Sequence, residues 1–122
     1  MKLETLDEGF SICKVKDFSQ INLNSELYFI SKTDREFALI CPTSRIPENT
    51  ISCEHGWRAF RLGGQLDFKL VGILSKIAVI LAGENIPILA YSTFETDYIF
   101  TKIKDFDHAL KVLKEHGYEV EE

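Results

Sequence analysis

The sequence predicts an α+β protein whose second half follows the order strand, helix, strand, strand, helix, strand. Short stretches alternate apolar with polar residues, as half-buried strands do. Two longer segments repeat their apolar residues every three or four positions, which places them on one face of a helix. Glycines and aspartates separate these segments, where turns form and helices begin or end. A chain of 122 residues, 45% of them hydrophobic, can bury one core or two small ones.

The first half is predicted to contain three strands, at residues 10–15, 27–30 and 37–41. Residues 17–22 lie between the first two strands and have room for little more than one helical turn. We therefore predict that residues 1–55 form a degenerate copy of the second-half unit, supported by strand order and length but not by sequence identity. The polar segment 43–50 is the expected boundary loop.

The second half, residues 56–122, is predicted to begin with a strand at 57–62 and to continue with a helix. Asp67 precedes this helix, and its carboxylate can cap the free amides of the first turn. Apolar residues recur at helical spacing from Leu70 onward. Gly83 suits the left-handed position that ends such a helix.

A hairpin and a second helix are predicted next. Residues 86–92 and 98–103 are β-prone segments around a tight polar connection. Asp105 can cap the second helix, Gly117 closes it, and residues 118–120 make a short last strand. Two helices on one face of an antiparallel sheet, in this order, define a ferredoxin-like βαββαβ fold.

Charge and hydropathy exclude two classes of partner. The formal net charge is −5, and lysines and arginines are scattered without forming a basic stripe, which argues against nucleic-acid binding. No apolar run reaches the roughly 18–20 residues that span a bilayer. Acidic residues occupy the N-terminal stretch where a signal peptide would be apolar. We therefore expect a cytoplasmic protein that does not associate with a membrane.

The three cysteines are too few, and odd in number, for a disulfide framework. Cys13 and Cys41 fall inside apolar strand patterns and are expected to be small buried hydrophobes. Cys53 and His55 are close in sequence, but no second pair completes a zinc-binding pattern. No metal site and no cofactor are expected.

The histidines give no catalytic arrangement. His55 is expected in a loop, while His108 and His116 lie on the second predicted helix. A Ser-His-Asp order in a strand-turn-helix context is absent from the sequence, and no carboxylate pair is placed for glycoside chemistry. We therefore expect a binding protein and not an enzyme.

The polar connection between the two hairpin strands is the candidate site. Thr93, Phe94 and Asp97 would offer a hydroxyl, an aromatic wall and a carboxylate at one rim of the sheet, a set that suits a small zwitterion. Each also has a structural explanation: Asp97 can stabilise the turn through its own backbone, Phe94 can pack in the core, and Thr93 can be an ordinary strand residue. Asp67 can act as a helix cap alone.

Several segments of the second half together resemble an ACT domain: 66–68, 72–74, 81–86 and 92–98. The resemblance is to the branch that includes small bacterial tandem-ACT proteins and the cytosolic arginine sensors called CASTOR. It covers residues 57–120 well and the first half only through strand order. It implies a regulatory protein that binds an amino acid or similar small ligand at an interface between two ACT units.

The resemblance also implies which residues meet the ligand. The ligand would lie between the loop opening the first helix and the rim of the following strand, and the residue aligned with Asp97 meets the ligand's basic side chain in the arginine sensors. The implied ligand-binding residues are Asp67, Gly72, Ile73, Thr93, Phe94 and Asp97.

Two further partners are expected. ACT units usually pair, so we expect a homodimer, and the apolar residues Val71, Val79 and Ile80, which fall off the core stripe of the first helix, could make that contact. A regulated protein partner would read the ligand state. The alternatives are a ligand-free protein–protein interaction module or an accessory subunit of an amino-acid biosynthetic enzyme.

Overall fold

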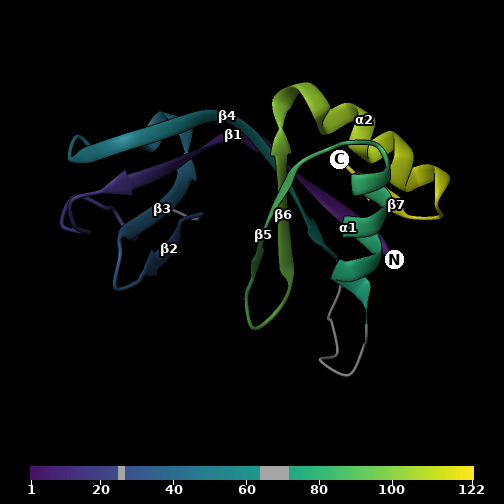
Figure 1. Cartoon of the computed structure of the whole chain (residues 1–122), viewed down its shortest axis with the longest axis horizontal. Helices are drawn as coiled ribbons and strands as arrows, with labels where there is room; N and C mark the ends of the chain where they lie inside the picture. The colour runs from purple at the N-terminus through teal and green to yellow at the C-terminus, as the bar shows by residue number, and fades with distance from the viewer. Residues whose placement is uncertain (25–26, 64–71) are drawn as a thin grey trace. The chain divides into compact units, whose positions relative to one another are not determined.

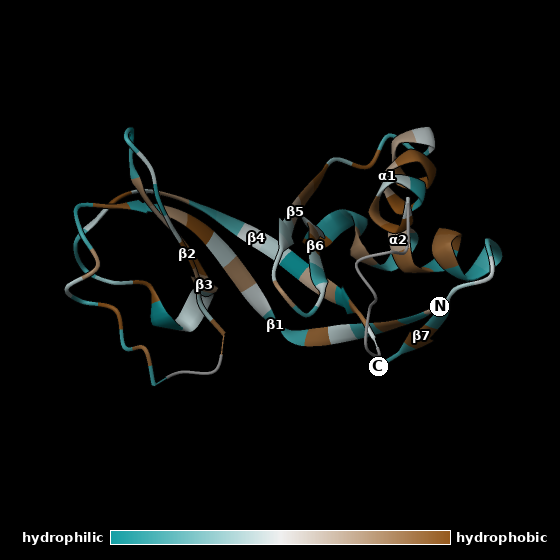
Figure 2. Cartoon of the chain, turned by 90° about the horizontal axis from the view of Figure 1, so that it is seen from below, coloured by the Kyte–Doolittle hydropathy of each residue, from teal (hydrophilic) through white to brown (hydrophobic). Residues whose placement is uncertain are grey.

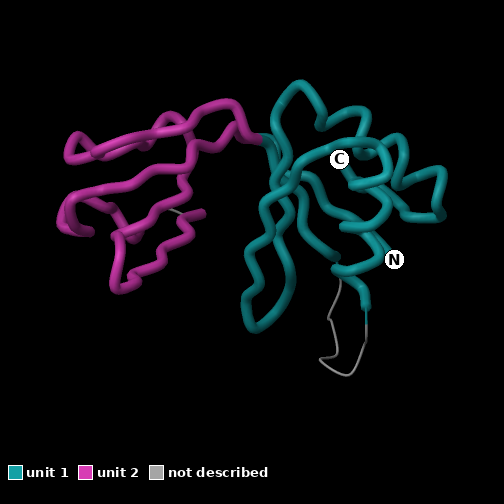
Figure 3. Tube along the Cα trace, in the orientation of Figure 1, with its two compact units in different colours: residues 1–7, 58–122 teal, residues 8–57 magenta. Residues whose placement is uncertain are grey.

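The computed structural model describes residues 1–24, 27–63 and 72–122. These residues divide into two compact units (Figure 3): unit 1 comprises residues 1–7 and 58–122, and unit 2 comprises residues 8–57. Two long strands, β1 (Lys2–Val15) and β4 (Thr50–Leu62), contribute one part to each unit.

Unit 1 consists of two helices and a sheet that includes an antiparallel hairpin (Figure 1). After β4 come α1 (Ile73–Gly83), β5 (Ile88–Ser92), β6 (Asp97–Lys102), α2 (Ile103–Glu115) and β7 (Glu119–Glu121). The predicted hairpin is confirmed, because β5 and β6 pair antiparallel from Ile88↔Thr101 to Ser92↔Asp97. Neither helix of the described ranges is long and apolar enough to cross a membrane.

One hydrophobic core holds unit 1 together. It contains residues of both helices, such as Ile77, Leu81 and Leu113, and fully buried residues of the sheet, such as Phe60 and Ile99. The apolar stripe predicted for each helix is therefore the face that packs on the strands. Most of α1 is hydrophobic, with Ser75 and Lys76 as its polar residues (Figure 2).

The strand at the N-terminal end is longer than the sequence predicted. The prediction began at residue 10, but β1 begins at Lys2, and its first residues belong to unit 1. They pair in parallel with β7, with Leu3 opposite Val120, and Leu3 is fully buried. The strand order of unit 1 is therefore β7-β1-β4-β6-β5. The sequence did not reveal this part of the strand because, among residues 2–7, Leu3 is the one buried residue and acidic residues follow it.

Both helices end in the same way, with a left-handed residue after the last turn. At α2 this residue is Gly117 (φ 94°), as predicted. The Tyr118 amide donates to Leu113 O at 3.1 Å and the Gly117 amide to Lys114 O at 3.0 Å, the two bonds of a Schellman motif. At α1 the left-handed residue is Asn85 (φ 58°).

Two predicted helix-terminal roles are therefore wrong. Gly83 is the last residue within α1, and the left-handed position falls two residues later. Asp105 lies in the first turn of α2, whose cap position is Lys102, so its carboxylate meets the positive end of the helix dipole and does not cap it. Asp67 lies outside the described residues.

Unit 2 is a sheet with a second, smaller core. Its strand order is β2 (Phe29–Lys32), β3 (Phe37–Pro42), β1, β4, and a 3₁₀ turn, Thr43–Arg45, follows β3. Residues 17–22, which have room for little more than one helical turn, form no helix, and the Ile21 amide donates to Phe18 O at 3.3 Å in a single turn. Asp17 instead accepts hydrogen bonds from the Ser19 hydroxyl, the Ser19 amide and Asn49, which lower the pKa of its carboxyl. His55, predicted in a loop, lies on β4.

Candidate functional site

The turn between β5 and β6 is held rigidly by its two threonines. The Thr93 amide donates to Thr96 O at 2.8 Å and the Thr93 hydroxyl donates to the same oxygen at 3.0 Å. The Thr96 amide donates back to the Thr93 hydroxyl at 3.3 Å. The Thr93 hydroxyl predicted to meet a ligand is therefore used inside the turn.

Phe94 occupies this turn with 83% of its surface exposed. Core packing, the structural explanation for Phe94, is excluded. Asp97 begins β6 opposite Ser92 and is partly exposed. The turn therefore presents an aromatic ring and a carboxylate three residues apart on an ordered backbone.

A hydrogen bond fastens this turn to the strand that precedes α1. The Thr96 hydroxyl donates to Leu62 O, the last residue of β4, at 2.7 Å. The start of α1 lies at the same end of unit 1 as the turn (Figure 1). There Gly72 is the cap residue with φ 79°, and because it has no side chain it cannot satisfy the first-turn amides. Ile73 follows as the first helical residue.

The structure thus brings the predicted residues together in two groups, Thr93, Phe94 and Asp97 on the turn and Gly72 with Ile73 at the helix start. Asp67 is the predicted residue that lies outside the described ranges.

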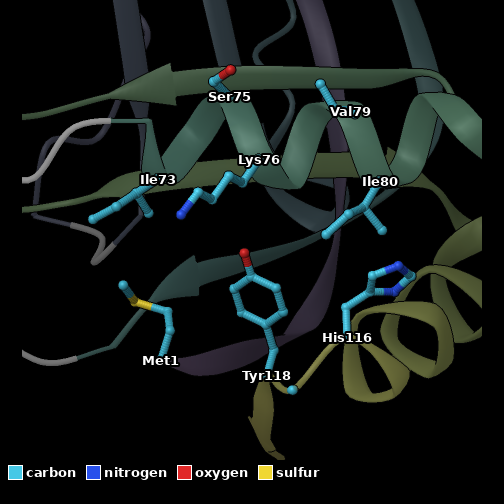
Figure 4. Close-up of a pocket in the computed structure, with 9 residues that line it drawn as sticks. Met1, Ile73, Ser75, Lys76, Val79, Ile80, His116 and Tyr118 are labelled. Carbon is cyan, nitrogen blue, oxygen red and sulfur yellow. The ribbon is translucent and has the colours of Figure 1, made fainter.

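A groove of about 600 Å³ runs along the outer side of α1 (Figure 4). Figure 4 shows the Tyr118 ring in its middle with the hydroxyl directed toward α1, and His116 beside Ile80. The groove is lined by Met1, Ile73, Ser75, Lys76, Val79, Ile80, His116, Gly117 and Tyr118. Of the predicted site residues that the structure describes, Ile73 alone lines it.

The groove joins apolar walls to a few polar groups. Lys76 supplies an ammonium, and Ser75 and Tyr118 supply hydroxyls. The Nδ1 of His116 donates to Val112 O at 2.9 Å, because a carbonyl can only accept. The sequence did not predict this groove. It placed Val79 and Ile80 off the core stripe, which holds for Val79, 69% exposed, but not for Ile80, which packs against the core of unit 1.

Unit 2 contains a buried serine beside a histidine. The Ser11 hydroxyl lies 2.8 Å from His55 Nδ1 and 2.9 Å from the Thr43 hydroxyl, and Ser11 is fully buried. Burial keeps this hydroxyl from reaching a substrate, so the pair is structural. Among the described residues, no three His, Cys, Asp or Glu side chains are grouped to hold a metal ion.

Comparison with known proteins decides the family. The sequence matches the model of the ACT domain over residues 52–115, from within β4 to the last residue of α2. The chain belongs to the ACT domain family. This match contains the turn with Phe94 and Asp97 and the described start of α1. No curated protein matches the sequence.

Solved structures share the fold at low sequence identity. A protein from Agobacterium tumefaciens is 24% identical, with a TM-score of 0.86 over 98% of this chain and 91% of its own. Aspartokinase alpha and beta subunits are 16% identical, with a TM-score of 0.65 over 94% of this chain and 96% of that one. An aspartate kinase of Clostridium acetobutylicum is 14% identical, with a TM-score of 0.65, and 87% of this chain covers 32% of the enzyme.

Proposed function

We propose that this protein is a regulatory module that binds an amino acid, or a similar small ligand, at the end of its ACT domain where the β5–β6 turn and the start of α1 lie. Membership of the ACT family supports small-molecule binding with a regulatory purpose. The fold shared with aspartokinases supports it further, since the Clostridium enzyme is described as allosteric.

The observation that carries this proposal is the ordered turn. Its backbone is fixed by Thr93 and Thr96, and the Thr96–Leu62 hydrogen bond joins it to β4. Phe94 and Asp97 are therefore presented in a preorganised position, which reduces the entropic cost of binding. Phe94 keeps 83% of its surface exposed on this turn, so its ring is accessible to a ligand.

The two groups of the site match the two charges of an amino acid. The first-turn amides of α1, which receive no hydrogen bond from a side chain of the cap residue Gly72, carry partial positive charge and suit the ligand carboxylate. The Asp97 carboxylate suits the ligand ammonium or a basic side chain, as a charge-assisted hydrogen bond. Phe94 offers an aromatic face for an apolar or cationic portion. A second copy of the chain would cover this open site, so binding at an ACT–ACT interface and a homodimer are part of the proposal.

A second candidate is an interaction module that acts without a ligand, including an accessory subunit of an amino-acid biosynthetic enzyme. The hydrophobic character of α1 favours it. A helix that is apolar on most sides is usually covered on both faces, yet Val79 is 69% exposed. In this case the groove beside α1, and not the turn, would be the functional surface.

A thermal-shift screen of the twenty amino acids and common polyamines tests the proposal. A ligand that binds only the folded state adds about 2.7 kcal/mol of stability at 100 times its dissociation constant, and so raises Tm. We expect a shift with one ligand class that is lost in Asp97→Asn and kept in Asp107→Asn, an exposed aspartate on α2.

The variants also separate the candidates. A shift that survives Asp97→Asn but is lost in Lys76→Met would place the ligand in the groove and contradict the proposed site. A flat screen on folded wild-type protein would refute the amino-acid proposal for the tested ligands and favour the interaction module.

A further inference from the structure

The three cysteines of the chain meet in unit 2, far along the sequence from one another. Cys13 lies on β1, Cys41 on β3 and Cys53 on β4, and all three belong to one apolar cluster. Cys13 and Cys41 are 3% and 0% exposed, while Cys53 is partly exposed. The Cys53 thiol is therefore accessible to small reagents, while the Cys13 and Cys41 thiols are buried.

Cys13 and Cys53 form the close pair. Their Sγ atoms are 2.8 Å apart, on strands that are neighbours in the sheet. The side chains of Ser11 and His55, each two positions along its strand from the cysteine, also meet. Residue 13 is therefore opposite residue 53, and residue 11 is opposite residue 55, on one side of the sheet. Facing positions have Cβ atoms about 4.5–5.5 Å apart, near the roughly 3.5–4.5 Å that a disulfide requires.

Cys41 is placed differently. It pairs across β1–β3 with Ser11, while the β3 residue opposite Cys13 is Leu39. Its thiol also reaches Cys13, but Cys41 is fully buried, which raises its pKa to about 11 and shields it from an oxidant. Cys53, which directly faces Cys13, is therefore the better partner.

We propose that Cys13 and Cys53 are an oxidation-sensitive dithiol, which a hydroperoxide converts into a reversible disulfide between β1 and β4. The inference is independent of the proposed ligand site, since every residue that it uses lies in unit 2.

The reaction has two steps. The Cys53 thiolate attacks one peroxide oxygen, the O–O bond breaks, and a sulfenic acid forms while the other oxygen takes a proton and leaves as an alcohol or water. The Cys13 sulfur then attacks the Cys53 sulfur, the S–O bond breaks, and water leaves with the Cys13 proton. Overall, two thiols and one hydroperoxide give one disulfide, one alcohol and one water.

The environment fixes the order of these steps. Cys53 reacts first because it is the exposed member of the pair, and the His55 Nδ1, 3.9 Å from its sulfur, is within reach of its S–H. Burial raises the pKa of the Cys13 thiol, which keeps it protonated until the sulfenic acid lies against it. The close approach of the two sulfurs then favours the disulfide over further oxidation of Cys53.

Oxidation of the full-length chain with hydrogen peroxide tests the proposal. After the remaining thiols are alkylated, we expect one free cysteine per chain and a peptide pair linked through Cys13 and Cys53 in nonreducing mass spectrometry. Dithiothreitol should restore three free thiols. The oxidised protein should also melt at a higher temperature than the reduced protein, because the cross-link restricts the unfolded chain.

Two variants make the result specific. Cys41→Ala should still form the intramolecular disulfide, while Cys53→Ser should not, and circular dichroism confirms that each variant is folded. Three free thiols after oxidation, a link through Cys41, a link between chains, or irreversible oxidation of Cys53 would each overturn the proposal.

Discussion

Ser11 shows how a single buried hydroxyl organises unit 2. It stands inside an apolar strand pattern and is fully buried, yet its oxygen meets two partners, Thr43 and His55. These partners lie 32 and 44 positions away in sequence. A buried hydroxyl is costly when unpaired, so the network fixes the 3₁₀ turn and β4 against β1.

The energetic asymmetry of this network is testable. Thr43→Val with His55→Phe replaces both partners by apolar groups of similar size, so the Ser11 hydroxyl stays covered without a partner, which should lower the free energy of unfolding by about 1–3 kcal/mol. Adding Ser11→Ala should recover part of that loss, because the unsatisfied group is removed. Urea unfolding measures the three proteins, and Ser44→Ala, at an exposed position, is the control. Equal stability of the double and triple variants would contradict the argument.

This network could not be predicted from the sequence, because a serine within a strand gives no indication of which distant residues its hydroxyl will bond. The same limit applies to the groove beside α1, whose lining comes from both ends of the described chain, Met1 and Tyr118. The β5–β6 turn was predictable for the opposite reason. Thr93 and Thr96 bond to each other three positions apart, and Asp97 pairs with Ser92 five positions before it.

At the scale of elements, the sequence predicted both helices and the hairpin but misassigned the left-handed residue after α1 and the cap residue of α2. Glycine and asparagine both tolerate the left-handed position, and α1 offers Gly83 and Asn85 close together. The structure assigns the position to Asn85, because the Ile86 amide then donates to Leu81 O at 3.0 Å and both residues stay in the core.

Two glycine substitutions should therefore have opposite effects. Gly117 has φ 94°, so Gly117→Ala forces a side chain into left-handed backbone and should cost about 1–2 kcal/mol. Gly83 is helical, and a Cβ there meets nothing within 4 Å, so Gly83→Ala should stabilise by about 0.4–1 kcal/mol. Thermal unfolding followed by circular dichroism measures both. Effects of the same sign would show that one helix end is misassigned.

At the scale of the whole molecule, β1 begins in one unit and ends in the other. Its first residues lie between β7 and β4, which joins the two ends of the chain in one sheet. Arg61 Nε donates to Glu4 Oε1 at 2.9 Å across β1 and β4, and the Gly63 amide donates to Lys2 O at 2.8 Å. The family match begins only at residue 52, so the ACT domain here is completed by a strand from outside it.

The core of unit 1 should then depend on Leu3, which is fully buried among residues that follow it by roughly half the chain or more. Leu3→Ala removes these contacts and leaves a cavity, so we expect a loss of about 2–5 kcal/mol in the free energy of unfolding. Leu23→Ala is the matched control, because Leu23 is 72% exposed and its loss should change little. Urea unfolding followed by far-ultraviolet circular dichroism compares the two. If Leu3→Ala were as stable as Leu23→Ala, the N-terminal strand would not be an integral part of this core, and the ACT domain would be complete without it.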